Sequence, residues 1–469
     1  MTARRAFFAC AAAALAAAGV CGRDLRVIAP ADGSDATATL QKTFDDCFLA
    51  GGGTVTLAPG EYNVGGLRLR SRTTLRMEAG AVLKGSRDCS RYRILAGDRL
   101  EPPRAKDVQH LDLTRQKLRE TPSLRGVVKL SNIYGNNWNN AMIRIYDATD
   151  VAIIGEKGSA LDGCNSYDPT NEEGYRGVHG IAVHYATNVV FRGFELRNTG
   201  NWAFSVREAR NLVFDDLDIV AGHDGTHFSM CNDVIVTNCR MATGDDCIAG
   251  FDNEHVRVSS CDLNTACSAF RFGGYDVLVE NTVCHGPAKH LFRGSLTQEE
   301  KAAGANVGAH ARHNMLSLFT YYADYTIKVR RTPGKILFRN VTCRNVDRFL
   351  HYNYSGNEQW QRGMPLGDVA FENVKAEGVK LPLCAYGDAD TPFSLAFRNV
   401  SISFADAPPE FIRGAYVEKI AADGLKVEGA RGPFFRTWGG FPAVDAKGVE
   451  GVEPSAVVPS AEPFRVSPI

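Results

Sequence analysis

Apolar and polar residues alternate along the middle of the chain in a unit that recurs at a nearly constant interval. Each unit alternates, shifts phase at a small or polar pair and alternates again, which predicts two short β-strands joined by a bend. The second residues of the five clearest units are separated by 23, 22, 22 and 21 positions: Val189, Leu212, Val234, Val256 and Val277.

A repeat of this length is typical of a solenoid, in which each unit buries its apolar face against its neighbours. Short strands, Gly and Asn at the corners and the lack of helical spacing favour a parallel β-helix over a helical solenoid. Related units occur on both sides of the clear block, at 151–154, 336–342, 369–375 and 395–401. Shorter segments at 53–57, 67–69 and 74–77 are expected to form the opening rungs.

The ends of the solenoid and its interruptions define the expected domain organisation. Leu40, Phe44 and Phe48 recur at helical spacing, which predicts an amphipathic helix that caps the open end of the core. We expect one all-β domain over residues 23–450 and a Pro-rich tail over 451–469. Two insertions break the period, at about 98–140 and at 163–180, and insertions in solenoids often line the binding face.

The first 22 residues have the pattern of an export signal. Arg4 and Arg5 precede an apolar run from Ala6 to Val20, and small residues follow. The two arginines also match a twin-arginine signal, and lipidation at Cys21 is a weaker alternative. The expected location is therefore periplasmic or extracellular, with a lipid anchor left open.

Composition excludes several classes of protein. The chain has 53 basic and 53 acidic residues, so it lacks the basic excess of a nucleic-acid binder. With 44% apolar and 23% charged residues it is not intrinsically disordered, and no stretch beyond the leader is long and apolar enough to span a membrane. The cysteines lack zinc spacing, and neither a metal nor a cofactor is expected. Cys239 and Cys261 share one inward column, where free thiols are favoured over a disulfide.

The fixed period also converts sequence offsets into columns of stacked side chains. Twelve positions after the start of each unit stand Asn201, Asp224, Asp246, Ser268 and Lys289. Rungs of a β-helix are about 4.8 Å apart, so Asp224, Asp245 and Asp246 should form one cluster. Stacked carboxyls separate their pKa values, and glycoside hydrolysis needs one protonated and one ionised carboxyl.

These acids lie in motifs that resemble glycoside hydrolase family 28, the polygalacturonase family of right-handed parallel β-helices. Asp224-Gly-Thr-His and Gly244-Asp-Asp-Cys247 are similar to the family's Asn-Thr-Asp and Asp-Asp motifs, and Asn198-Thr-Gly-Asn-Trp202 is similar to the turn one rung earlier. The resemblance covers most of residues 35–300 and implies hydrolysis of a pectin-like or other acidic polysaccharide. It assigns Asp245 as the general acid and Asp224 and Asp246 as the groups that activate water, with inversion at the anomeric carbon.

Two departures from the family leave the substrate open. The family's Gly-His-Gly histidine falls near Cys267 and Ser268, and its carboxylate-binding Arg-Ile-Lys has no clean match near Lys289 and Arg293. Arg271 and Arg293 lie one rung apart, and paired arginines suit a sugar carboxylate. The candidate substrate-binding residues are Arg271, Arg293, Lys289, His290, His227, Trp202, His179 and Arg176. Tyr175, Arg176 and His179 would wall one end of the cleft.

Two other functions fit the same architecture. A polysaccharide lyase would hold Ca²⁺ with the three acids and use an arginine such as Arg271 as the base. A non-catalytic β-helix that binds glycans would need neither the missing His nor the altered Arg-Ile-Lys.

Overall fold

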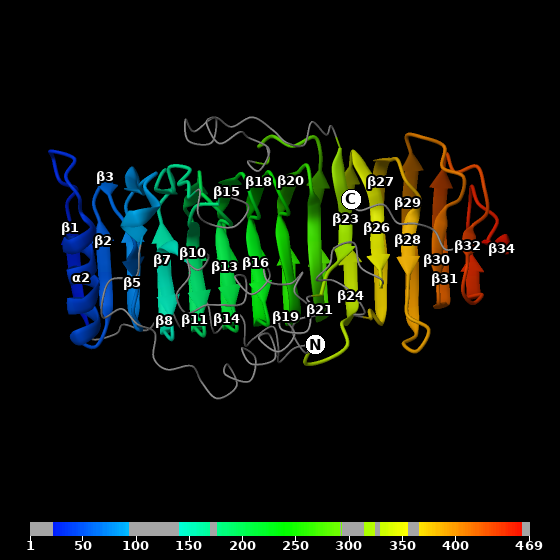
Figure 1. The fold of residues 1–469 in the computed structure, drawn as a ribbon, viewed down its shortest axis with the longest axis horizontal. Helices are drawn as coiled ribbons and strands as arrows, with labels where there is room; N and C mark the ends of the chain where they lie inside the picture. Colours follow the sequence, from blue (N-terminus) through cyan, green and yellow to red (C-terminus); the bar gives the residue numbers. More distant parts are fainter. Residues whose placement is uncertain are drawn as a thin grey trace.

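Successive units of the repeat stack as parallel strands along one axis in the computed structural model. The structure describes residues 22–92, 140–168, 176–290, 292, 314–323, 329–354 and 365–461. The strands stand side by side along the long axis of the molecule, from β1 and α2 at one end to β34 at the other (Figure 1). They form three parallel sheets, here named sheets I, II and III, and each rung contributes one strand to each sheet in turn.

Sheet I begins each rung. It consists of β1 (Arg23–Val27), β2 (Gly53–Leu57), β5 (Thr73–Met77), β8 (Thr149–Gly155), β11 (Thr187–Arg192), β14 (Arg210–Asp215), β17 (Asn232–Thr237), the second parts of β19 (Ile248–Ser259) and β21 (Ser268–Glu280), β24 (Gly334–Arg339), the first parts of β27 (Asp368–Val379), β29 (Phe393–Phe404) and β31 (Val417–Glu428), and β33 (Ala443–Lys447).

Sheet II follows the bend after sheet I. It consists of β3 (Gly60–Asn63), β6 (Ala81–Lys84), β9 (Ala160–Asp162), β12 (Glu195–Arg197), β15 (Asp218–Ala221), β18 (Arg240–Thr243), β20 (Asp262–Thr265), β22 (Val283–His285), β25 (Thr342–Arg344) and the second parts of β27, β29 and β31.

Sheet III ends each rung and positions the site described below. It consists of β4 (Leu67–Arg68), β7 (Ala141–Tyr146), β10 (His179–His184), β13 (Phe204–Arg207), β16 (Thr226–Ser229), the first parts of β19 and β21, β23 (Met315–Tyr321), β26 (Val346–Asn353), β28 (Leu383–Tyr386), β30 (Ile412–Ala415), β32 (Phe435–Thr437) and β34 (Val457–Pro459). A 3₁₀ turn, η1 (Cys89–Tyr92), follows β6.

The bend between sheets I and II is the phase shift that the sequence predicts. Asn residues stand there in the left-handed backbone region, with φ of 54° at Asn340, 53° at Asn373 and 50° at Asn399. Asn and Asp tolerate this region better than other side chains that carry a Cβ. Their amides also bond from rung to rung, Asn373 Nδ2 to Asn340 Oδ1 at 3.1 Å and Asn399 Nδ2 to Asn373 Oδ1 at 2.8 Å.

Apolar side chains fill the space between the three sheets. Phe191, Phe204, Phe214 and Phe228 stack through successive rungs with ring centroids 5.0–5.3 Å apart. Cys239 and Cys261 are buried in the expected column, and all 11 cysteines of the described residues are free thiols.

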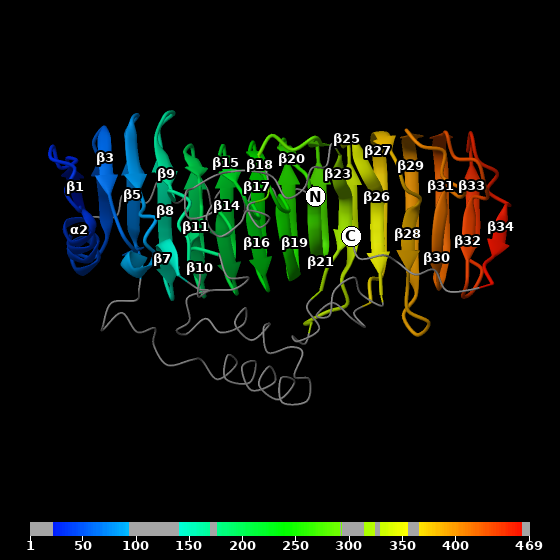
Figure 2. The same ribbon diagram turned by 45° about the horizontal axis from the view of Figure 1, so that its top comes forward.

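The N-terminal cap forms as a helix, α2 (Thr37–Leu49), that packs on the first strands (Figure 2). Leu40 and Phe44 are buried as expected, but the third buried residue is Cys47 rather than Phe48. Phe48 is half-buried, and the guanidinium groups of Arg70 and Arg72 lie 5.9 and 5.4 Å from its ring centroid. At the other end the solenoid passes the expected boundary at residue 450, because β34 pairs with β32. Within the described residues no helix has the length and apolarity needed to cross a bilayer.

Candidate active site

Three aspartates lie on neighbouring rungs in the turns that join sheet II to sheet III. Asp224 lies between β15 and β16, and Asp245 and Asp246 lie between β18 and β19. Thr226 pairs with Ile248, and the same step of 22 residues places Asp224 opposite Asp246. The amide of Gly225 donates a hydrogen bond to the Asp246 carbonyl at 2.9 Å, so the two turns are stacked directly.

Close packing fixes the shape of these turns. A Cβ on Gly225 would lie 2.7 Å from the Cys247 carbonyl oxygen, so only glycine allows the rungs to approach this closely. The hydroxyls of Thr243 and Thr265 both donate to the Asp245 carbonyl, at 2.7 and 2.6 Å. The backbone beneath the acid pair is therefore held by side chains from two rungs.

Burial and mutual repulsion favour the protonated forms of two of these acids. Asp246 is 2% exposed, and burial followed by the charge of Asp245 raises its pKa to about 7. Burial also raises the pKa of Asp224 well above its usual value, with the charges of Asp245 and Asp246 adding to the effect. The amide of Ser268 donates to Asp246 Oδ1 at 2.9 Å, which stabilises the ionised form. The cluster therefore keeps at least one proton near neutral pH.

His227 contacts the first of the acids from the outer face of β16. Its Nδ1 lies 3.1 Å from Asp224 Oδ2, and its ring stacks on Trp202 with centroids 3.9 Å apart and planes 5° apart. The edges of Phe251 and Tyr322 complete the enclosure, at 6.2 and 6.4 Å. Burial lowers the pKa of His227 well below 6.5, and Arg271 adds to the shift, which favours the neutral ring. A hydrogen bond therefore joins Nδ1 to Asp224, with one proton shared between the two groups.

Two arginines supply positive charge beside the acids. Arg271 lies in the column that begins with His227, its guanidinium carbon 4.0 Å from the centroid of the Tyr322 ring. Arg176 is 7% exposed and its Nη1 lies 3.1 Å from Asn201 Oδ1 and 3.3 Å from His223 Nδ1. Both charges act to lower the pKa of Asp224, against the effect of burial.

Trp202 and His179 pack beside this cluster. The ring centroids of His179 and Trp202 are 5.2 Å apart, and His179 is fully buried. Trp202 thus packs against both His227 and His179. It packs against the ring of His227 from the preceding rung.

The structure places some predicted members of the acid column elsewhere. Ser268 pairs with Ser317 on the next rung, so the column continues to Ser317 and not to Lys289. An insertion after β22 adds residues to that rung and ends the constant period on which the prediction rested. At the other end of the column the step between β13 and β16 is 22 rather than 23 residues, which brings Trp202, not Asn201, opposite Asp224.

The remaining predicted residues are only partly described. Lys289 is exposed, and its backbone amide donates to Asn264 Oδ1 at 2.6 Å on the sheet II side. His290 is half-buried in the same segment. Arg293 and Tyr175 lie outside the described residues, so the expected Arg271–Arg293 stack does too.

Three polar residues of this face were given no role in the sequence analysis: Cys267, His184 and Arg207. Cys267 stands where the family motif has its histidine, and its sulfur and one oxygen of each of Asp245 and Asp246 lie within 4.8 Å of one another. His184 and Arg207 pair across β10 and β13 on the outer face of sheet III and are 1% and 7% exposed. Their spacing of one rung is visible in the sequence, but each stands in a strand before the clearest part of the repeat.

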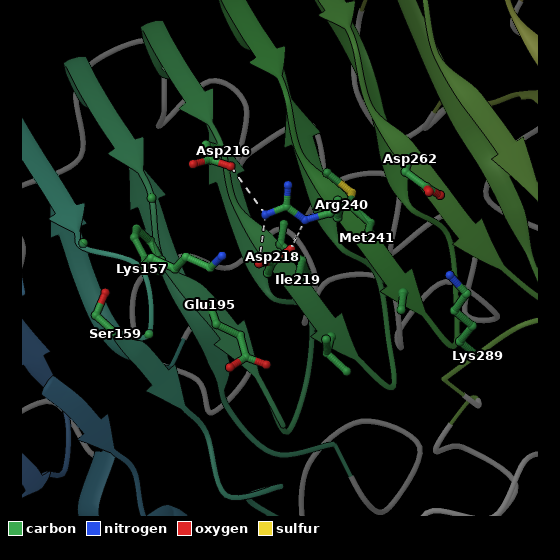
Figure 3. Close-up of a pocket in the computed structure, with 16 residues that line it drawn as sticks. Lys157, Ser159, Glu195, Asp216, Asp218, Ile219, Arg240, Met241, Asp262 and Lys289 are labelled. Atoms are coloured by element: carbon green, nitrogen blue, oxygen red, sulfur yellow. Dashed lines mark hydrogen bonds and ion pairs between the residues drawn. The ribbon is translucent and has the colours of Figure 1, made fainter. Parts of the chain in front are cut away.

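A separate hollow of about 870 Å³ lies on the outer face of sheet II and does not contain the three aspartates (Figure 3). Its charged side chains largely pair with each other: Arg240 bonds both Asp216 and Asp218. Asp262 pairs with His285 at 2.8 Å. Lys289 lines this hollow beside Asp262, which confirms that it lies apart from the acid column.

Sequence comparison relates the chain to one family. Residues 103–268 match the family described as Glycosyl hydrolases family 28. A polygalacturonase of Brassica napus is 25% identical over 253 residues, which are 49% of this chain and 57% of that protein. A polygalacturonase of Medicago sativa is 27% identical over 251 residues, 49% of this chain and 53% of that protein. The chain thus matches a little over half the length of these curated relatives.

Solved structures share the architecture. An exopolygalacturonase from Thermotoga maritima has a TM-score of 0.60 at 15% identity, covering 87% of this chain and 94% of that chain. The polygalacturonase from Erwinia carotovora has a TM-score of 0.54 at 14% identity, covering 81% and 93%. At these identities the likeness shows the fold alone, and it confirms the expected right-handed parallel β-helix.

The sequence match includes the three aspartates, and the structural likeness extends over most of the solenoid. The prediction of a family 28 resemblance is confirmed, and the chain is a divergent relative of glycosyl hydrolase family 28.

Proposed function

We propose that this protein is a glycoside hydrolase of the polygalacturonase type that cleaves an acidic polysaccharide. The observation that carries the proposal is the stacking of Asp224, Asp245 and Asp246 in one pair of turns beside Arg176 and Arg271. Glycoside hydrolysis needs one protonated carboxyl for the leaving oxygen and one ionised carboxyl that activates water, and a cluster of acids that share protons can supply both. The polygalacturonase relatives point to the same class of reaction.

Each aspartate has a distinct role in the proposed reaction. Asp245, half-exposed at the turn, protonates the glycosidic oxygen as the bond to the anomeric carbon breaks. Asp224 and Asp246 together activate the water that attacks from the opposite side: the ionised one of the two accepts the water's proton, and the product then has inverted configuration. The neutral His227 holds Asp224 in orientation through Nδ1–H and stabilises its ionised form.

A retaining reaction is the specific alternative for stereochemistry. One oxygen of Asp245 and one of Asp246 lie within 4.8 Å, which is closer than the roughly 6.5–9.5 Å usual for inverting pairs. Asp246 would displace the leaving oxygen, protonated by Asp245, and form a covalent bond to the anomeric carbon. Water that gives its proton to Asp245 would then displace Asp246, and the two inversions would retain the configuration. Following the first-formed anomer by NMR separates the two reactions.

The proposed substrate carries carboxylates. Arg271 and Arg176 place positive charge within reach of the acid cluster, and a guanidinium binds a carboxylate through two parallel hydrogen bonds. Because these positive charges act on Asp224 and Asp246, the cleft is not simply anionic and suits a uronic-acid chain. We propose a pectin-like polymer as the first substrate to test.

The calcium-dependent lyase is less well supported. Calcium binds oxygen ligands, whereas the third group within 4.8 Å of Asp245 and Asp246 is the thiol of Cys267. A lyase would also release an unsaturated product that absorbs ultraviolet light, and a chelator would stop it.

The decisive experiment compares the parent chain with the Asp245→Asn variant on pectic and other acidic polysaccharides. We expect new reducing ends without ultraviolet absorption from the parent, and a loss of about 10³-fold or more in turnover from the variant. Circular dichroism and thermal unfolding check that the variant folds. Equal activity of the two chains would reject the hydrolase and favour a glycan-binding protein.

We also propose that the protein is exported through the Arg4-Arg5 leader, because a polysaccharide substrate lies outside the cell. Replacing both arginines with lysine should leave the protein in the cytoplasm. Unchanged export of that variant would reject the twin-arginine route.

A further inference from the structure

Exposed aromatic side chains gather at the C-terminal end of the solenoid. Tyr416, Trp438 and Phe441 are 37%, 39% and 65% exposed, and among the described residues they are three of six large apolar side chains that reach solvent. The rings of Tyr416 and Trp438 meet at 61° with centroids 6.0 Å apart. Exposed aromatic rings that lie together mark surfaces that bind a partner or ligand.

The two rings belong to neighbouring rungs and are held by backbone hydrogen bonds. The amide of Tyr416 donates to the Gly439 carbonyl at 2.6 Å, and the amide of Trp438 donates to the Gly414 carbonyl at 3.2 Å. A Cβ on Gly439 would lie 2.7 Å from the Tyr416 ring, so the ring rests directly on that backbone. Their positions are therefore fixed before any ligand arrives.

A pair of arginines lies on the same two rungs. Arg413 of β30 pairs with Arg436 of β32, and a carboxylate that is 2% exposed, Glu410, binds both. Arg413 Nε donates to Glu410 Oε1 at 2.7 Å, and Arg436 Nε donates to Oε2 at 3.3 Å. Two guanidiniums against one carboxylate leave a net positive charge. Strand β32 ends at Thr437, and Trp438 follows it directly, two residues after Arg436.

We propose that Arg413, Tyr416, Arg436 and Trp438 bind a second stretch of the uronic-acid chain that is cleaved at the aspartates. Together with Glu410, which holds the two arginines, they are here named the C-terminal surface. The class of ligand rests on the proposed function. Aromatic faces stack on the C–H faces of sugars, and guanidiniums bind their carboxylates. Glu410 orients the arginines and is not itself a contact for the ligand.

One end of the C-terminal surface, Glu410, lies in the same column as Asp246. The column of Asp246 continues through Ser268, Ser317, Arg348 and Leu381 to Glu410. Five rungs at about 4.8 Å each separate the two sites by about 24 Å, the length of several sugar residues. A long chain can therefore touch both sites, whereas a trimer cannot.

The test measures binding rather than cleavage. In the full chain with Asp245→Asn, we expect polygalacturonate to bind more tightly than trigalacturonate. Trp438→Ala or Arg436→Gln should lower the affinity for the polymer about tenfold and so remove this advantage of length. The matched controls Leu49→Ala and Arg398→Gln, exposed residues far from this surface, should keep the affinity of the parent.

Three results would overturn the inference: polymer affinity unchanged by both substitutions, equal loss of affinity for an uncharged galactan, or a dimer in ultracentrifugation that Trp438→Ala dissociates while polymer binding persists. The last would assign the surface to a second copy of the chain. A protein that shows the expected length-dependent binding but cuts no acidic polysaccharide would reject the hydrolase and leave the C-terminal surface in place.

Discussion

The protonation state of each residue in the site depends on the charges and the protonation states of its neighbours. Asp224 and Asp246 are buried beside Asp245, and His227 forms a hydrogen bond with Asp224. Two predictions at this scale separate the electrostatic role of these groups from a merely structural one.

The first prediction concerns how the free energy of unfolding depends on pH. The folded pKa of Asp246 is about 7 and its unfolded value is 3.8, so between these values the folded state binds more protons than the unfolded state. The free energy of unfolding should therefore fall as pH rises from about 4 to 7, by at most ~1.4 kcal/mol per pH unit for one group, and level off above 7. Denaturation at several pH values should show this slope in the parent.

Asp246→Asn removes the titrating group but keeps an oxygen that accepts the Ser268 amide. We expect a smaller slope in this variant, and no change from Asp262→Asn, which alters a half-exposed acid on sheet II. An identical slope in Asp246→Asn and the parent would contradict the raised pKa.

The second prediction concerns His227 as a positioning residue. His227→Phe keeps a ring against Trp202 but lacks the Nδ1–H that donates to Asp224, so kcat should fall by about 10- to 100-fold with little change in KM. The acid limb of the pH profile should move to higher pH, because Asp224 loses a donor that stabilises its ionised form. His227→Asn keeps a nearby N–H and should recover part of the rate. Equal loss in both variants would indicate a packing role only.

At the scale of elements, the bends between sheets combine a backbone requirement with a side-chain ladder. Asn373 has φ of 53° and bonds Asn340 and Asn399 above and below. Asn373→Ala should lower the free energy of unfolding by about 1–3 kcal/mol, because it loses the ladder bonds and strains an Ala in the left-handed region. Chemical denaturation measures the difference.

Asn373→Gly is the matched control, since glycine adopts that backbone without strain but also lacks the amide. Its cost should be smaller than that of Asn373→Ala. If Ala and Gly cost the same, the backbone conformation contributes nothing and the ladder alone matters.

The elements also show what the sequence could and could not predict. The repeat predicted the strands, the bend and the stacking of Asp224 on Asp246, because all of these depend on a local period of 22 residues. Lys289 was misplaced since the insertion after β22 changes the length of a rung, and a period cannot be counted through an insertion. Tyr322 and Arg348, which lie beyond that insertion, were missed for the same reason.

Phe48 was misassigned because a helix buries positions 3.6 residues apart, and Cys47 satisfies that spacing as well.

At the scale of the whole molecule, the cap covers one end of the solenoid. Helix α2 covers the first strands, whose backbone groups would otherwise form an open edge. Phe44→Asp places a charge in the buried face of α2 and should expose that edge, so we expect aggregation or oligomers in size-exclusion chromatography. Leu49→Asp, at a side chain 78% exposed, should stay monomeric. A monomeric Phe44→Asp variant that unfolds like the parent would show that the cap is dispensable.

The constant rise of the rungs makes the distance between two sites on the solenoid proportional to the number of coils between them. If a polymer binds at Trp438 and is cut at Asp245, the number of coils between these two residues sets the length of the polymer fragment that stays bound to the protein. Removing or duplicating one coil would then shift the fragment length by about one sugar and leave the chemistry of cleavage as it is.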